Sequence, residues 1–239
     1  MSEEPPLNVD ALKCENAKHH LLIRQKMIDA AEGRLVGVVE EFDKAFDILG
    51  KYEKTVSIFG SARVVKDSPI YLRAFAVAWA LAKHDFAIVT GGGHGVMEAA
   101  NHGAKKAGGV SIGFNIELPT EQSLNPYTTE SYSFEHFFGR KVALTLDASG
   151  YIFCGGGFGT LDELFEIMTL EQTGMIPKAP IILMGKDFWR PLDHFIRQTL
   201  AEAHNTINPE DTSLYHITDN IEEIVGVVSD YSDKHYSTS

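Results

Sequence analysis

Short apolar segments that alternate with amphipathic stretches dominate the chain from residue 55 onward and limit the folds open to it. This alternation is typical of parallel strands joined by crossover helices that cover both faces of the sheet. The apolar runs are Val56–Phe59, Phe86–Val89, Val110–Ile116, Tyr151–Phe153 and Pro180–Met184. Helix-like segments lie near 69–83, 95–107, 134–147, 161–173, 188–203 and 218–231, the last with Asp219 or Thr218 as its N-cap. The pattern predicts an α/β fold, doubly wound around a mostly parallel sheet.

The first fifty residues stand apart from this alternation. Residues 10–49 show the three-to-four spacing of an amphipathic helix, and Gly50 follows it. The apolar positions that carry the spacing are Leu35, Val38, Val39, Phe42, Phe46 and Leu49. We expect an N-terminal helical extension over residues 1–50, either a cap on the core or an oligomer-forming arm. A Rossmann-like nucleotide-binding domain is expected over residues 51–239.

Charge and composition narrow the class of partner. The 239 residues carry 21 Lys and Arg against 33 Asp and Glu, a formal charge of −12. This balance argues against a nucleic-acid polymer, which selects a basic surface, but a small phosphate needs only a local positive pocket. The chain has two cysteines, no apolar signal segment, and no apolar run longer than the nine residues Ala74–Ala82. We therefore expect a cytoplasmic protein with no membrane span.

Three loops at the ends of predicted strands carry residue types that bind ligands. Gly60–Arg63, Thr90–Glu98 and Cys154–Glu163 follow the first, second and fourth apolar runs, and parallel sheets bind ligands at these ends. Two of the loops are rich in glycine, which lets successive backbone N–H groups approach a ligand. Each of these two leads into a helix whose N-terminus attracts anions. Together they predict a site for a phosphate or another oxyanion.

Neither glycine-rich loop matches a standard nucleotide fingerprint. Val96 and Thr160 stand where the dinucleotide pattern has its third glycine, and no Gly-Lys-Ser/Thr sequence ends either loop. Glu117 sits near the end of the third apolar run, where dinucleotide-binding folds carry a ribose-binding acid, but the broken fingerprint argues against a nicotinamide cofactor. We expect no cofactor, and no histidine–cysteine cluster has metal-site spacing.

Several of these residues also have ordinary structural explanations. Thr160 and Glu163 have the spacing of a capping box, so Glu163 either closes the first helical turn, takes part in chemistry, or does both. Arg140 and Lys141 lie either on a solvated helix face or in a site, which their aromatic, glycine-containing neighbourhood favours. Cys154 ends a strand, where a thiol usually packs as a small apolar residue.

Four blocks follow one another in order between Ser57 and Trp189. They are Phe59–Arg63, Thr90–Glu98, Arg140–Lys141 and Gly155–Glu163, with Thr169–Gly174 after them. This set resembles the Lonely Guy (LOG) family of phosphoribohydrolases, longer bacterial type, once labelled lysine decarboxylases. The last block is similar to the family's PGGxGTxxE signature, with Gly155 in place of the proline and a freer backbone there.

The resemblance implies a hydrolase that cleaves the N-glycosidic bond of nucleoside 5′-monophosphates. The substrate would be AMP or a cytokinin riboside 5′-monophosphate, and the products a free base and ribose 5-phosphate. Arg140 and Glu163 would be the catalytic residues. The residues implied to hold the 5′-phosphate are Gly156, Gly157, Gly159 and Thr160. Further candidates for nucleoside contacts are Ser61, Gly92, Gly93, His94, Glu98 and Lys141.

The same scaffold also serves molybdenum-cofactor carriers, so a nucleotide- or molybdenum-cofactor-binding protein without turnover is the alternative. Arg140 and Glu163 favour the enzyme, because a carrier needs neither. A decarboxylase of amino acids would need pyridoxal and a lysine to hold it, and nothing marks such a lysine. Members of the family form dimers with sites near the subunit interface, so we expect a homodimer or a higher homo-oligomer.

Overall fold

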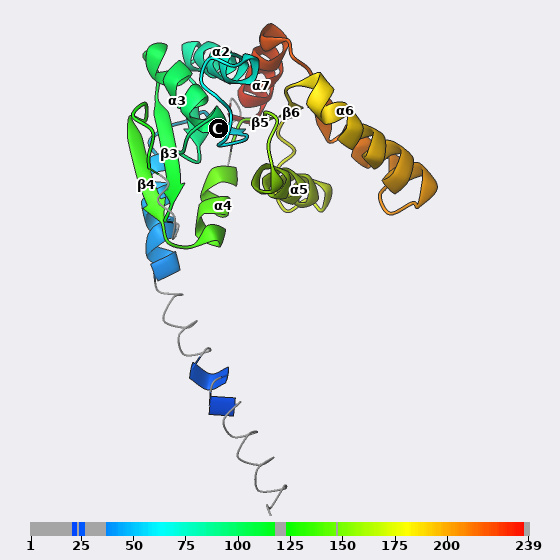
Figure 1. The fold of residues 1–239 in the computed structure, drawn as a ribbon, viewed down its shortest axis with the longest axis horizontal. Helices are drawn as coiled ribbons and strands as arrows, with labels where there is room; N and C mark the ends of the chain where they lie inside the picture. The colour runs from blue at the N-terminus through cyan, green and yellow to red at the C-terminus, as the bar shows by residue number, and fades with distance from the viewer. Residues whose placement is uncertain (1–20, 23, 27–36, 118–122, 147, 237–239) are drawn as a thin grey trace, which may run out of the picture. The chain divides into compact units, whose positions relative to one another are not determined.

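A seven-stranded sheet organises the computed structural model, which describes residues 21–22, 24–26, 37–117, 123–146 and 148–236 (Figure 1). The strands are β1 (Thr55–Phe59), β2 (Ala87–Thr90), β3 (Ser111–Ile116), β4 (Glu130–Phe134), β5 (Tyr151–Phe153), β6 (Ile181–Leu183) and β7 (Tyr215–Ile217). They lie in the order β4-β3-β2-β1-β5-β6-β7, and each neighbouring pair is parallel. The predicted doubly wound α/β fold is confirmed. Its chain order reverses between β1 and β5, where such sheets bind ligands.

Helices cover both faces of the sheet. One face packs against α2 (Pro69–Lys83), α3 (Val96–Lys106) and α7 (Ile221–Tyr236). The other packs against α4 (Phe137–Thr145), α5 (Phe158–Gln172) and α6 (Lys186–His194). Figure 1 shows α2 and α7 above β5 and β6, and α4 and α5 below these two strands. Because central strands are covered on both sides, β1 is buried at every position, with Ile58 on the α2 side and Phe59 on the α5 side.

The two strands that the sequence did not predict lie at the edges of the sheet. β4 alternates half-buried and exposed positions until the buried Phe134 at its end, and β7 has only three residues. An edge strand pairs on one side only, so its sequence lacks the continuous apolar run that marks a buried parallel strand. The segment near 134–147, predicted as one helix, is therefore the end of β4 followed by α4.

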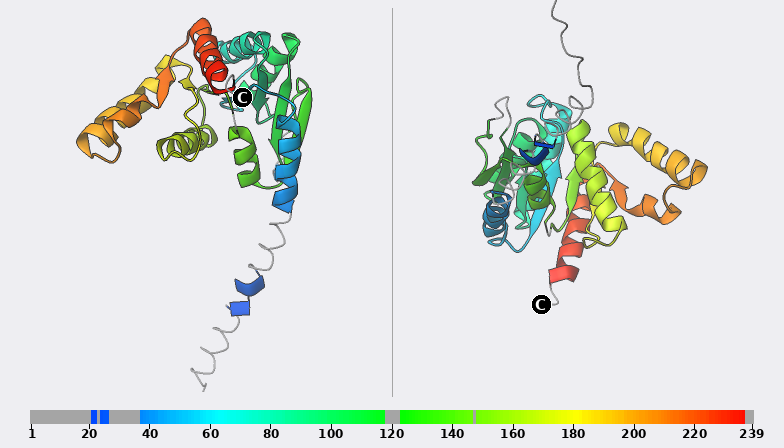
Figure 2. Two further views of the ribbon diagram at one scale, coloured as in Figure 1. Left: turned by 180° about the vertical axis from the view of Figure 1, so that it is seen from behind. Right: turned by 90° about the horizontal axis from the view of Figure 1, so that it is seen from below.

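The helix predicted near 188–203 begins earlier and changes its winding within that range. After α6 the chain continues in the wider turns of η1 (Phe195–Ala203) and then in a short 3-10 helix, η2 (Pro209–Ser213). Pro191 lies inside α6 and has no backbone N–H to donate, which loosens the regular hydrogen-bond pattern around it. In both views of Figure 2 these segments extend away from the sheet.

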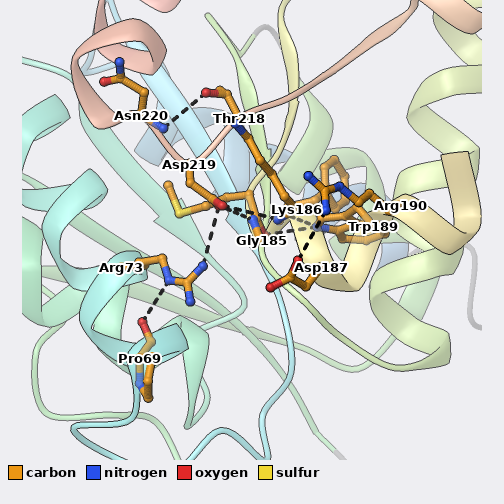
Figure 3. A network of polar contacts seen from close by, with 12 residues as sticks. Pro69, Arg73, Gly185, Lys186, Asp187, Trp189, Arg190, Thr218, Asp219 and Asn220 are labelled. Atoms are coloured by element: carbon orange, nitrogen blue, oxygen red, sulfur yellow. Dashed lines mark hydrogen bonds and ion pairs between the residues drawn. The ribbon is translucent and has the colours of Figure 1, made fainter.

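The start of α7 differs from the prediction. Its N-cap is Asn220, not Asp219 or Thr218, because the Asn220 side-chain oxygen accepts two first-turn backbone N–H groups at 3.0 and 3.3 Å. Asp219 instead accepts the backbone N–H of Gly185 at 2.6 Å and lies 3.6 Å from Arg73 of α2 (Figure 3). This carboxylate therefore links three elements at the carboxyl ends of the strands.

The N-terminal extension lies only partly within the described residues. Contacts divide the chain into residues 1–43 and 44–239. Of the predicted 10–49 helix, residues 21–22, 24–26 and 37–49 are described and helical, and the others lie outside the described residues. The domain boundary after residue 50 and the homo-oligomer stay predictions. Among the described residues, no helix has both the length and the apolar character that a membrane span requires.

A buried carboxyl group near the end of α5 makes stability depend on pH. Glu171 is 1% exposed, and burial raises its pKa from 4.5 to about 8. The folded state favours the protonated acid, so this contribution to stability is present below the unfolded pKa and is lost as pH rises through about 8. We expect Glu171→Gln to melt at a higher temperature than the wild type at about pH 9 and at a similar temperature at about pH 5.

Thermal unfolding followed by circular dichroism at both pH values measures this difference. The amide of the variant keeps an oxygen that accepts the backbone N–H of Ala179, as the carboxyl group does at 3.1 Å. An equal change in melting temperature at the two pH values would show that ionisation of Glu171 does not control stability.

Candidate functional site

A cleft of ≈ 620 Å³ opens at the reversal point of the sheet, beside the ends of β1 and β5. The loop after β1 forms one wall, the start of α5 forms another, and Arg140 and Glu163 face into it from α4 and α5. Strand register brings the first two walls together, since Phe59 is paired with Phe153 at the ends of the two strands. The larger apolar side chains in the lining are Met97, Ile116, Phe137, Phe158 and Leu161.

The first backbone N–H groups of α5 have no side-chain cap among the described residues. Gly157 is the N-cap, and Gly157, Gly159 and Thr160 line the cleft. A side chain at Gly157 or Gly159 would meet no atom within 4 Å, so the space beside the backbone is open at both. Uncapped N–H groups at a helix N-terminus, together with the helix dipole, favour a bound anion.

The capping box considered for Thr160 and Glu163 is not formed. With Gly157 as the N-cap, Thr160 is the third residue of α5 and Glu163 lies a turn further on, beyond the uncapped N–H groups. Gly156 lies behind Thr160, because a Cβ at Gly156 would collide with the Thr160 hydroxyl. Four residues were predicted to hold a phosphate. Gly157, Gly159 and Thr160 line the cleft, whereas Gly156 does not, and its missing side chain leaves space for Thr160.

Arg140 and Glu163 face each other across the cleft. Arg140 Nη1 lies 4.0 Å from Glu163 Oε1, and the two side chains are 12% and 16% exposed. Arg140 Nε donates a hydrogen bond of 2.8 Å to the backbone carbonyl of Phe114 in β3, which fixes the direction of the guanidinium. The alternative of a solvated helix face is therefore wrong for Arg140.

Burial sets the protonation of this pair. It raises the pKa of Glu163 from 4.5 to about 7, and the positive charge of Arg140 opposes this rise. Burial also lowers the pKa of Arg140 below its usual value. A carboxyl group with a pKa near neutrality can take up and release a proton near pH 7, as a catalytic acid or base must.

Lys141, the next residue of α4, points to a different partner. Its Nζ lies 2.9 Å from Asp162 Oδ2 and 3.2 Å from Glu166 Oε2, both on α5. Lys141 therefore bridges the two helices that carry the catalytic candidates, and it does not line the cleft, although it was a candidate for nucleoside contacts.

The first glycine-rich loop lies beside the cleft and is held by buried polar side chains. The Thr90 hydroxyl accepts the backbone N–H of Gly92 at 2.9 Å and donates to Asn101 Oδ1 at 2.7 Å. Asn125 Nδ2 donates to the carbonyls of Gly92 and Gly93 at 2.9 and 3.0 Å. Gly92 and Gly93, predicted to contact the nucleoside, therefore serve the internal structure of the loop and do not line the cleft.

The remaining candidates divide between the cleft and its surroundings. His94 Nδ1 lies 3.3 Å from Glu98 Oε2, and His94 Nε2 lies 3.1 Å from the hydroxyl of Ser123. Neither His94 nor Glu98 is among the residues that line the cleft. Ser61 does line the cleft, and its backbone N–H donates to the carbonyl of Gly155 at 3.2 Å. This hydrogen bond joins the loop after β1 to the loop after β5.

Two contributors to the cleft lie outside the predicted set of site residues. The Phe114 carbonyl that orients Arg140 has no signal in the sequence, because any residue supplies a backbone carbonyl. Arg63 lines the cleft and was visible as the cationic end of the first block. Cys154 is 1% exposed and burial raises its pKa to about 12, so it packs as an apolar residue. Among the described residues, no group of His, Cys, Asp and Glu is arranged to hold a metal ion.

Comparison with known proteins assigns the family. Residues 97–228 match the family described as "Possible lysine decarboxylase". The chain is 30% identical over 154 residues to the cytokinin riboside 5′-monophosphate phosphoribohydrolase of Mycobacterium marinum, covering 64% of this chain and 80% of that protein. The chain belongs to the LOG family. Its identity to the LOG-family enzyme of the same name from Rhodococcoides fascians is 25% over 178 residues, covering 73% of this chain and 89% of that protein.

Solved structures show the same fold as this LOG-family chain. The molybdenum cofactor binding protein from Rippkaea orientalis superposes with a TM-score of 0.55 at 21% identity, covering 74% of this chain and 96% of that one. At this identity the likeness extends to the fold and not to the ligand.

The geometry of the pair predicts how Glu163 titrates. Because the positive charge of Arg140 lowers the pKa of Glu163 against the effect of burial, we expect Arg140→Met to raise that pKa above about 7. Titration of ¹³C-labelled glutamate carboxyl groups by NMR measures the change. Arg190→Met is the matched control, since Arg190 pairs with Asp187 on α6 and should leave the titration unaltered. An unchanged pKa in Arg140→Met would show that the two groups do not interact.

Proposed function

We propose that this LOG-family protein hydrolyses the N-glycosidic bond of nucleoside 5′-monophosphates to a free base and ribose 5-phosphate. The observation that carries the proposal is the Arg140–Glu163 pair, which faces the cleft within two helical turns of an uncapped helix N-terminus. The relatives from M. marinum and R. fascians, named as cytokinin riboside 5′-monophosphate phosphoribohydrolases, support an enzyme of this kind.

The start of α5 is the proposed phosphate site. The backbone N–H groups around Gly157 and Gly159 and the hydroxyl of Thr160 would donate to the phosphate oxygens. Glu163 lies three residues after Thr160, on the same side of the helix and roughly 4.5 Å further along its axis. A nucleotide held by its phosphate at the helix end would therefore present its sugar to the Glu163 carboxyl group.

The chemistry of the reaction matches these groups. The bond between C1′ and the base nitrogen breaks, and a water molecule supplies a hydroxyl group to C1′ and a proton to the departing base. Positive charge develops on the ribose as this bond breaks, as in other glycoside cleavages. Ionised Glu163 would balance that charge and accept the proton of the attacking water, while Arg140 would favour the ionised form of Glu163.

A panel of nucleoside 5′-monophosphates tests the activity. We expect AMP or a cytokinin riboside 5′-monophosphate to give equal amounts of free base and ribose 5-phosphate, measured by chromatography. The matched nucleosides without phosphate are the control, and they should react far more slowly because they lack the group that the α5 N-terminus binds. Binding of a nucleotide without release of ribose 5-phosphate from any of them would contradict the enzyme and indicate a carrier.

Substitutions at the pair test its role. We expect Glu163→Gln and Arg140→Ala each to lower kcat by about a hundredfold or more, with the melting temperature preserved. In the wild type, the rate should rise with pH through about 7, because ionisation of Glu163 creates the active carboxylate. Glu171→Gln, the same change at the other end of α5 and outside the cleft, is the matched control. Wild-type turnover in Glu163→Gln would remove Glu163 from the mechanism.

A further inference from the structure

Gly91 lies directly against the guanidinium of Arg140. A Cβ at Gly91 would collide with Arg140 Nη2 and would lie 2.7 Å from Met97 Sδ and 3.3 Å from Arg140 Cζ. The nearest atoms are thus the ends of two side chains and not backbone. The space that a side chain would fill at Gly91 is taken up by Arg140.

The backbone conformation does not explain the glycine at this position. Gly92 and Gly95, in the same loop, have φ values of 69° and 66°, in the region that favours glycine, and Gly91 is not among the described glycines with positive φ. An alanine at Gly91 would therefore be acceptable to the chain, and only the contact with Arg140 and Met97 opposes it.

The loop cannot withdraw from Arg140. It leaves β2 at Thr90, whose hydroxyl bonds both to the N–H of Gly92 and to the buried amide of Asn101. On the other side, Asn125 is 1% exposed and holds the carbonyl of Gly92 by its backbone N–H and by its side chain, at 2.9 Å each. With the loop held on both sides, an added methyl group at Gly91 would have to displace the guanidinium.

We propose that Gly91 is a positioning residue, which seats the Arg140 guanidinium against the rigid first glycine loop and so holds it opposite Glu163. This inference rests on the proposed function, and it assigns the two glycine-rich loops different tasks. In the loop after β5, glycines leave the backbone N–H groups accessible to the ligand. In the loop after β2, Gly91 leaves space for the side chain of Arg140 against the backbone. The Phe114 carbonyl and Gly91 together fix the guanidinium at Nε and at Nη2.

Gly91→Ala tests whether Gly91 positions the Arg140 guanidinium, through two independent measurements. We expect kcat for the nucleotide found in the panel to fall by about tenfold to a hundredfold, with a smaller change in KM, because a displaced charge no longer fits the transition state. In ¹⁵N-labelled protein, the Arg140 Nε–H hydrogen-bonded to Phe114 should exchange with water faster in the variant. This exchange needs no substrate, so it reports on the position of the Arg140 guanidinium even if the chain hydrolyses no nucleotide.

Two further variants separate position from stability. Gly226→Ala, at an exposed site on α7 where a Cβ would meet no atom within 4 Å, should leave rate and exchange unchanged. If Gly91→Ala alone fails to fold, Gly91→Ala/Arg140→Ala should fold with the melting temperature of Arg140→Ala. The nearer colliding group, the guanidinium, is then gone, and the flexible end of the Met97 side chain can turn aside from the added methyl group. Wild-type rate and Arg140 exchange in Gly91→Ala, or a double variant that also fails to fold, would overturn the proposal.

Discussion

The burial of two opposite charges 4.0 Å apart is the constraint on which the site depends. Removing a carboxylate and a guanidinium from water costs free energy that an ion pair recovers only with good geometry and further hydrogen bonds. Arg140 and Glu163 meet this only in part, since the guanidinium has the Phe114 carbonyl and the carboxyl group keeps a pKa near 7. Such an arrangement is a poor way to stabilise a fold and a suitable way to hold a group ready to exchange a proton.

The surrounding structure supplies the rigidity that this pair lacks. Lys141 ties α4 to α5 through Asp162 and Glu166, which limits movement of the two helices that carry the charges. Asn101 and Asn125 fix the loop behind the guanidinium through hydrogen bonds within a buried network. A buried network whose members are hydrogen-bonded defines one conformation more sharply than apolar packing does. Precision at the cleft is therefore provided by residues that do not line it.

Sequence patterns predicted the buried strands and most helices, which depend on burial and local conformation. They did not predict the edge strands or the side-chain pairs, which depend on tertiary neighbours. The runs that became β1, β2, β3, β5 and β6 are mostly apolar and are buried at every position, because helices cover both of their faces. The edge strands β4 and β7 lack such runs and were not predicted. The pairing of Arg140 with Glu163, 23 positions apart, came from resemblance to a family and not from spacing. Lys141, one residue from Arg140, points away from the cleft, since adjacent residues of a helix do not share a face.

The departure from the family signature at Gly155 shows the same dependence on neighbours. In the sequence alone, a glycine in place of proline frees the backbone at the start of the proposed phosphate-binding loop. In the fold, the ring of Phe188 from α6 occupies that side of the chain, with its nearest atoms 3.1 and 3.2 Å from where a Cβ would stand. The Gly155 carbonyl also accepts a hydrogen bond from the Ser61 N–H at the reversal point of the sheet. The family's proline would restrain this backbone through its own ring. At Gly155 the packing of Phe188 and the hydrogen bond to Ser61 restrain it instead, because tertiary contacts can supply a restraint that the residue itself lacks.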